Sequence, residues 1–275
     1  PVSCHAAFLT ATAAVVMCGV EKGIERVSKV LMPLLFVLML ILIVRGLSLP
    51  GASEGLTFLF QWNPEAFTGE ALLNAMGFAF FSLSVGSGSQ MNYGSYLGRD
   101  IDIPKSTTWI VFLAIMSSIL GGLMIMPAVF AFGLSPYAGP GLTFVTMPAV
   151  FGKLPLGDLF AVAFYVCLFV AALTSAISIL EMSVQYLVDV WRLTRRQSVW
   201  ATSTTLGILG ILCALSFGPL ADVTIFGKGF FDLFDYATSN IGMPLGCLGL
   251  AIVGGMVAWK DVKEELETGS RIGKT

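Results

Sequence analysis

A dense run of serine and glycine lies inside an apolar stretch at residues 71–97. Its nine residues 82–90 hold four serines, two glycines and one glutamine. Glycine costs about 1 kcal/mol against alanine in a helix interior, and serine competes for backbone hydrogen bonds. We expect the helix to be discontinuous here, which frees amides and carbonyls to line a cavity for a polar solute. The alternative is a continuous helix that packs through its small residues.

A second polar group lies within the apolar stretch at residues 157–187. Ala171, Thr174 and Ser175 follow the i, i+3, i+4 spacing, so two hydroxyls and one helix carbonyl share a face. Hard oxygen ligands without a carboxylate suit a weakly held monovalent cation. The competing interpretation is that both hydroxyls bond to helix carbonyls one turn back and serve only packing.

Four carboxylates lie near the ends of apolar stretches. Asp189 closes one stretch, and Glu181 lies two turns deeper in it. Asp232 and Asp235 open the last stretch, where the helix dipole favours negative charge. Glu181 is the most costly of the four to bury, and it needs a partner or a water-filled path.

The elements that must position these residues are membrane-spanning helices. The 275 residues are 56% hydrophobic and 12% charged, whereas soluble domains are about 25% charged. The mean hydropathy is +0.86. Too few charges exist to cover a water-soluble fold, so the lipid bilayer is the expected surrounding. The net charge of -2 gives no reason to expect a nucleic-acid partner.

About 20 apolar residues of helix cross the hydrocarbon core. We expect one transmembrane domain over residues 1–275, with spans at roughly 6–20, 30–46, 71–97, 107–133, 157–187, 198–217 and 233–258. The apolar segment 141–152 is too short to span. It predicts a re-entrant or surface-lying hairpin within about 136–155, on the extracellular side.

Lysine and arginine distribute unequally between the two sets of connecting loops. The loops on one side of the membrane hold 12 of the 15 lysine and arginine residues, and those on the opposite side hold Arg45, Lys153 and Lys228. The positive-inside rule makes the richer side cytoplasmic. The first span then runs from outside to inside, and the C-terminal tail is cytoplasmic in the plasma (inner) membrane.

Several short motifs, in this order and spacing, resemble the neurotransmitter:sodium symporters, and in particular bacterial members. The resemblance extends from about Thr10 to Glu264. The motifs are Lys22-Gly23-Ile24-Glu25-Arg26, Met32-Pro33, Phe81-Ser82-Leu83-Ser84-Val85-Gly86, Tyr93-Gly94-Ser95-Tyr96, Gly141-Leu142-Thr143-Phe144, Met147-Pro148-Ala149-Val150-Phe151 and Ala171-Ala172-Leu173-Thr174-Ser175.

The resemblance implies an all-α, polytopic membrane protein with part of the leucine-transporter-type inverted-repeat fold. The seven spans resemble helices four to ten of that family, so helices one to three are expected to be missing partners of the same transporter. The implied function is sodium-coupled symport of an amino acid by alternating access, and not an enzymatic reaction.

The resemblance also assigns roles to single residues. Those implied to face the substrate are Phe81, Ser82, Ser84, Ser87, Ser175 and Ile179. Those implied to bind sodium are Ala171, Thr174 and Ser175 at the second site and Ser82 at the first. The implied outer gate residue is Asp235, with Asp232 as the alternative. The implied inner gate residue is Asp189, with Tyr96 nearby.

Three positions depart from the family pattern. The segment Phe112-Leu113-Ala114-Ile115-Met116 lies where an Asn or Asp is usual as a first-site sodium ligand, which places that site in question. Phe78 stands four residues before Ser82 where chloride-dependent members carry glutamine, so chloride coupling is doubtful, although Ser117 or Ser118 falls near the other chloride-linked position. Ser87 replaces a bulky residue and predicts a roomier pocket than a small aliphatic substrate needs.

Other classes of function remain to be weighed. A non-transporting scaffold or regulatory protein derived from such a transporter is the main alternative. A membrane-embedded hydrolase would need a base beside a serine, and the single histidine is His5, near one end of the chain. A channel would need rings of like charge or a repeated carbonyl motif.

Overall fold

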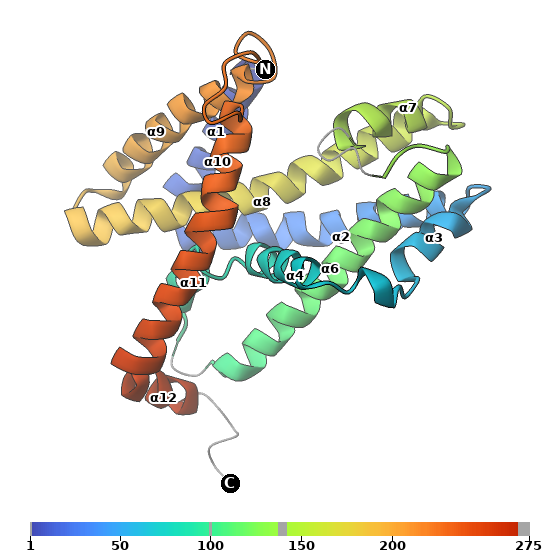
Figure 1. Cartoon of the computed structure of the whole chain (residues 1–275). Helices are drawn as coiled ribbons and strands as arrows, with labels where there is room; N and C mark the ends of the chain where they lie inside the picture. The colour runs from blue at the N-terminus through green and yellow to red at the C-terminus, as the bar shows by residue number, and fades with distance from the viewer. Residues whose placement is uncertain (1, 99–100, 137–141, 269–275) are drawn as a thin grey trace. The chain divides into compact units, whose positions relative to one another are not determined.

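The computed structural model of the chain (Figure 1) describes residues 2–98, 101–136 and 142–268. The chain divides into two compact units, and each is described by itself. The first unit comprises Pro1–Ile24, Phe67–Phe112 and Ala176–Thr275, and the second comprises Glu25–Ala66 and Leu113–Ser175.

Helices dominate the described part of the chain, as expected from the sequence. The α-helices are α1 (Val2–Met17), α2 (Arg26–Leu47), α3 (Ala52–Phe60), α4 (Gly69–Ser82), α5 (Ser89–Gly94), α6 (Ile103–Ala131), α7 (Met147–Phe151), α8 (Gly157–Trp191), α9 (Arg195–Leu215), α10 (Phe230–Asp235), α11 (Met243–Ile252) and α12 (Trp259–Thr268). Four π-helical segments (Val20–Glu25, Leu142–Thr146, Tyr236–Gly242 and Val253–Val257) and one 3-10 turn (Pro64–Ala66) adjoin them.

Five continuous helical segments in the described ranges are long and apolar enough to cross a membrane. They are Gly23–Leu47, Ile103–Ala131, Gly157–Trp191, Arg195–Leu215 and Phe230–Val257. Two shorter apolar helices, Val2–Met17 and Ala71–Ser82, lie at the two remaining predicted spans. Large apolar side chains such as Val44 and Leu73, each 69% exposed, point outward, as a bilayer or neighbouring helices would require.

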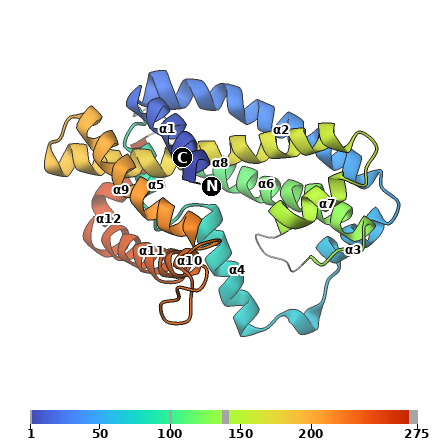
Figure 2. The same ribbon diagram turned by 90° about the horizontal axis from the view of Figure 1, so that it is seen from above.

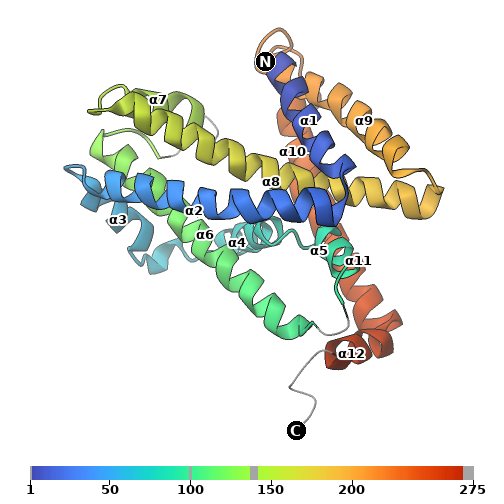
Figure 3. The same ribbon diagram turned by 180° about the vertical axis from the view of Figure 1, so that it is seen from behind.

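In the first unit, α1 and α9 run side by side (Figures 1 and 3). Glycines on α9 permit this approach: Leu9 lies 3.4 Å from the place where a side chain on Gly207 would begin, and the ring of His5 fills that place at Gly210. Small residues at such positions are typical of helix pairs inside membranes.

In the second unit, the first half of α8 packs beside α2 (Figures 2 and 3), where the Cys167 thiol lies 3.9 Å from the Leu35 carbonyl. The core holds Met39, Leu42, Ile43, Leu49, Ala52, Ala128, Val129, Met147, Val150, Phe151, Phe164 and Cys167. The segment expected as a hairpin is helical over residues 142–151, and its residues 137–141 lie outside the described ranges.

Candidate functional site

The helix expected over residues 71–97 is interrupted. The helix α4 ends at Ser82, and α5 begins at Ser89. At the end of α4, the Val85 N–H donates to the Phe80 carbonyl at 3.0 Å, and the Ser84 N–H donates to the Phe81 carbonyl at 3.0 Å. This pair of bonds is a Schellman motif. Ser84 occupies its left-handed position with φ 52°, where glycine is usual. The discontinuous helix expected here is confirmed.

Side chains within the break satisfy part of its exposed backbone. The Ser87 hydroxyl donates to the Ser84 carbonyl at 2.8 Å, and the Gln90 amide donates to the Leu83 carbonyl at 3.2 Å. Among the described residues, none accepts a hydrogen bond from the backbone N–H groups of residues 86–88. These donors, inside an apolar protein, are available to a polar solute.

Two glycines hold the break against α11. Gly86 has φ +91°, and a methyl group there would overlap the Met243 carbonyl and the Cys247 thiol. On α11, a methyl group at Gly246 would in turn overlap the Gly86 carbonyl. The two backbones therefore meet directly, so the conformation of the break depends on glycine at both positions.

Phe81 and Asp235 line one cleft of about 450 Å³ within the first unit. Phe81 was predicted to face the substrate, and Asp235 was predicted to be the outer gate. The Phe81 side chain is 60% exposed, and the Asp235 carboxylate accepts a hydrogen bond from the Ser239 hydroxyl at 3.0 Å. Asp232, the alternative gate residue, lies in the first turn of α10 and is not among the residues lining this cleft. The remaining lining residues are Leu73, Gly77, Phe78, Ser239, Asn240 and Pro244.

The hydroxyl of Thr174, on α8, is buried and points to the helix backbone. It donates to the Val170 carbonyl at 3.1 Å and to the Ala171 carbonyl at 3.0 Å. Ser175 and Ile179 are exposed on the same helix. The Thr174 hydroxyl and the Ala171 carbonyl therefore lie together on one face of α8. The bond to the Val170 carbonyl is the one that the packing interpretation expects, so the sodium site stays a prediction.

The serines of the break and the residues of the expected ion site belong to different compact units. Ser82, Ser84 and Ser87 follow one another in the first unit, and Thr174 and Ser175 lie in the second. The substrate-facing and sodium-binding roles assigned to these residues stay predictions.

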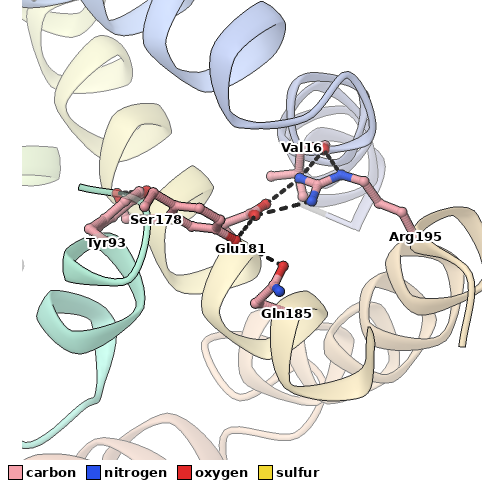
Figure 4. Close-up of polar contacts among 7 residues, drawn as sticks. Val16, Tyr93, Ser178, Glu181, Gln185 and Arg195 are labelled. Carbon is pink, nitrogen blue, oxygen red and sulfur yellow. Dashed lines mark hydrogen bonds and ion pairs between the residues drawn. The ribbon is translucent and has the colours of Figure 1, made fainter. Parts of the chain in front are cut away.

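Glu181, which required a partner on sequence grounds, has one in Arg195 (Figure 4). The Arg195 guanidinium donates to both carboxylate oxygens of Glu181, at 3.2 and 2.5 Å. The same guanidinium donates to the Val16 carbonyl at 3.0 and 2.7 Å. The Glu181 side chain is fully buried and that of Arg195 is 29% exposed, so the pair is shielded from water on the carboxylate side.

Tyr96 and Gln185 connect this ion pair to Asp189. The Tyr96 hydroxyl lies 2.8 Å from the Gln185 side-chain oxygen and 3.3 Å from the Glu181 carboxylate. The Gln185 amide donates to Asp189 at 2.9 Å. Tyr96 and Asp189, predicted as a gate, are therefore connected through Gln185 rather than in direct contact.

Sequence reasoning placed Arg195 among the cytoplasmic cations and missed its role. Its position follows from a capping box at the start of α9: the Gln197 N–H donates to the Thr194 hydroxyl at 3.4 Å, and the Thr194 N–H donates to the Gln197 side chain at 3.0 Å. This Thr-x-x-Gln pattern is a sequence signal that fixes the helix start. It places Arg195 in the first turn of α9, from which its side chain reaches Glu181 on α8.

The length and apolarity of these helices define a multi-pass helical membrane protein. Residues 4–261 match the model of the sodium:neurotransmitter symporter family. The chain belongs to this family, and the resemblance seen in its motifs is confirmed.

Individual relatives agree with this assignment. A sodium-dependent transporter of Bacillus subtilis, YhdH, is 42% identical over 97% of this chain, and a sodium-dependent transporter of Haemophilus influenzae is 38% identical over 91% of it. The crystal structure of MhsT in complex with L-phenylalanine matches 98% of this chain with a TM-score of 0.88 and 41% identity. The prediction of an all-α membrane protein with part of the leucine-transporter-type inverted-repeat fold is thereby confirmed.

The chain spans only part of these relatives. It covers 59% of YhdH and 62% of the MhsT chain. The residues described above are therefore a portion of what a protein of this family contains.

Proposed function

We propose that the protein containing this chain is a sodium-coupled amino-acid symporter that works by alternating access. The observation that carries the proposal is the break between α4 and α5. There, free backbone N–H groups and serine hydroxyls lie in the middle of an otherwise apolar helical stretch. Unsatisfied backbone at membrane depth is tolerated only where it lines a cavity or a binding site.

The amino-acid class of the substrate is supported by two features. The MhsT structure was obtained with L-phenylalanine, and donors such as the N–H groups of residues 86–88 suit a carboxylate. Phe81, Ser82, Ser84 and Ser87 then face the amino acid from the break, and Ser175 and Ile179 face it from α8. Because Ser87 is small, the pocket is expected to accept a large side chain.

Sodium is the proposed co-transported ion. The Thr174 hydroxyl and the Ala171 carbonyl, 3.0 Å apart, with the Ser175 hydroxyl, would supply half of one site from α8. Ser82 would contribute to a first site, where Ala114 offers no side-chain oxygen. Phe78 argues against chloride coupling, because it provides no ligand for an anion.

Two sets of side chains would close the pathway. Asp235, in the cleft that it shares with Phe81, is the proposed outer gate. On the opposite side, Asp189, Gln185 and Tyr96 form the proposed inner gate. Sodium binds the outward-facing state more strongly than the inward-facing one, so an inward sodium gradient drives the amino acid with it. The loop charges orient the inner gate and the C-terminal tail toward the cytoplasm.

The experiment that tests this proposal is uptake of a labelled amino-acid mixture by proteoliposomes that contain the full-length protein. An inward sodium gradient is compared with an equal potassium gradient. Sodium-dependent uptake, with tryptophan and leucine competing better than glycine and alanine, supports the proposal. If the folded, correctly inserted protein takes up no amino acid, the non-transporting scaffold becomes the better account.

A further inference from the structure

The helix α5 and the turn that follows it are connected to α8 through the hydroxyl groups of two tyrosines, Tyr93 in α5 and Tyr96 in the turn. Tyr93 and Tyr96 lie three residues apart, and the hydroxyls of both bond to side chains on α8. Figure 4 shows Tyr93 beside Ser178. The Tyr93 hydroxyl donates to the Ser178 hydroxyl at 3.0 Å, and the Tyr96 hydroxyl contacts Gln185 at 2.8 Å. These two bonds lie two turns apart along α8.

The Tyr93 bond lies next to the expected ion site, and the Tyr96 bond does not. Ser178 follows Thr174 by four residues and Ser175 by three in the continuous helix α8, so it occupies the next turn on the same side. Glu181 and Gln185, the contacts of Tyr96, lie one and two turns further along. Tyr93 is thus the α5 side chain that bonds closest, along α8, to Thr174.

The bond is also placed where its loss has a measurable effect. Both hydroxyls are partly buried, and a hydrogen bond lost away from water costs more than one lost at an exposed surface. A conformational change that separates α5 from α8 must break this bond. A state that keeps the two helices together retains it.

We propose that the hydrogen bond between Tyr93 and Ser178 links sodium binding on α8 to the position of α5. The inference rests on the proposed function. A contact made in only one of two conformations stabilises that conformation, and any ligand that favours the same conformation then binds more tightly. In this proposal sodium favours the conformation that keeps α5 against α8, so the bond strengthens sodium binding without touching the ion.

The test measures the position of α5 directly and needs no knowledge of the substrate. Ser95 is exposed directly after α5, so Ser95→Cys, in a full-length protein whose other cysteines are replaced, reports on that helix through its rate of alkylation by N-ethylmaleimide. The rate is measured as potassium is exchanged for sodium. The half-effective sodium concentration is compared among Tyr93→Phe, Ser178→Ala and the double variant.

We expect each single variant to raise the half-effective sodium concentration about three- to tenfold, the range expected for one lost hydrogen bond. The double variant should raise it no further than either single variant, because both remove the same bond. Tyr165→Phe is the matched control, since its hydroxyl bonds elsewhere, to the Thr143 carbonyl at 3.1 Å, and it should match wild type.

An unchanged half-effective sodium concentration in both single variants, or additive effects in the double variant, would overturn the inference. An alkylation rate that does not change with sodium, in a protein that still takes up amino acids, would also overturn the inference. That result would leave the proposed function intact. Loss of both the sodium response and uptake in wild type would overturn both. Elution of each variant as a single species in gel filtration establishes that the comparison is between folded proteins.

Discussion

Arg195 reaches from the first turn of α9 to Glu181 on α8 and to the Val16 carbonyl near the end of α1. One guanidinium thus ties three helices of the first unit together. Removing one member of a buried ion pair leaves an uncompensated charge, which costs about 3–5 kcal/mol, whereas replacing both members is often nearly neutral. The arrangement identifies Arg195 as a structural support for the face of α8 that Tyr96 contacts.

We expect Arg195→Ala to lower the free energy of unfolding by about 3–5 kcal/mol, because Glu181 is left buried and unpaired. Glu181→Gln combined with Arg195→Met should recover most of that loss. The measurement is thermal unfolding in detergent, followed by size-exclusion chromatography. Arg196→Ala, on the neighbouring residue, is the control. Equal stability of Arg195→Ala and Arg196→Ala would show that the pair is not buried in the folded protein.

The contact between the break and α11 predicts a contrast between two glycines of one helix. A methyl group at Gly246 would overlap the backbone of Gly86, and a methyl group at Gly249 meets nothing within 4 Å. We expect Gly246→Ala to reduce uptake at least tenfold and to lower stability. Gly249→Ala should retain uptake and, by its higher helix propensity, gain up to about 1 kcal/mol. Similar uptake by both variants would mean that the two backbones do not meet.

Sequence reasoning anticipated the helical membrane fold and the break because both depend on local composition. Apolar stretches of span length and a cluster of small polar residues at 82–90 carry that information without any tertiary contact. It also placed Thr174 and the Ala171 carbonyl together, because the spacing within one helix fixes which residues share a face.

The partners of Glu181 and Tyr96 were not anticipated, because they depend on how separate helices pack. Arg195 lies 14 residues after Glu181 in the sequence and beyond a turn, and charge counting assigned it only to a cytoplasmic loop. Likewise, Gln185 lies between Tyr96 and Asp189 because of the approach of α5 to α8. No local pattern in the sequence encodes that approach.

The small side chain at Ser87 predicts which substrates are preferred. Ser87→Leu should fill part of the pocket and lower the affinity for tryptophan at least about tenfold, since one or more methylene groups of misfit cost 1–3 kcal/mol. Competition for uptake of a labelled amino acid measures this, with glycine and alanine expected to compete relatively better than in wild type. An unchanged order of competitors would place Ser87 outside the pocket.

The cleft of Phe81 predicts a difference between the two aspartates of α10. Asp235→Asn removes the charge that lines this cleft and should raise the KM for uptake about tenfold, equivalent to 1.4 kcal/mol. Asp232 lies in the first turn of the same helix, outside the residues that line the cleft. Asp232→Asn should therefore keep the KM within about twofold of the wild-type value. KM values for both variants, measured at saturating sodium, decide the assignment. The reverse order would make Asp232 the gate residue.

The central claim is that this chain carries part of a sodium site on α8. Thr174→Ala combined with Ser175→Ala, in the full-length protein, tests it through sodium-dependent uptake in proteoliposomes. The control is Thr108→Ala on α6, whose hydroxyl makes the same kind of bond to a carbonyl one turn back, at 2.9 Å. We predict that the double variant loses sodium-dependent uptake, or requires at least about tenfold more sodium, while Thr108→Ala behaves as wild type. Unchanged sodium dependence in the double variant would contradict the account.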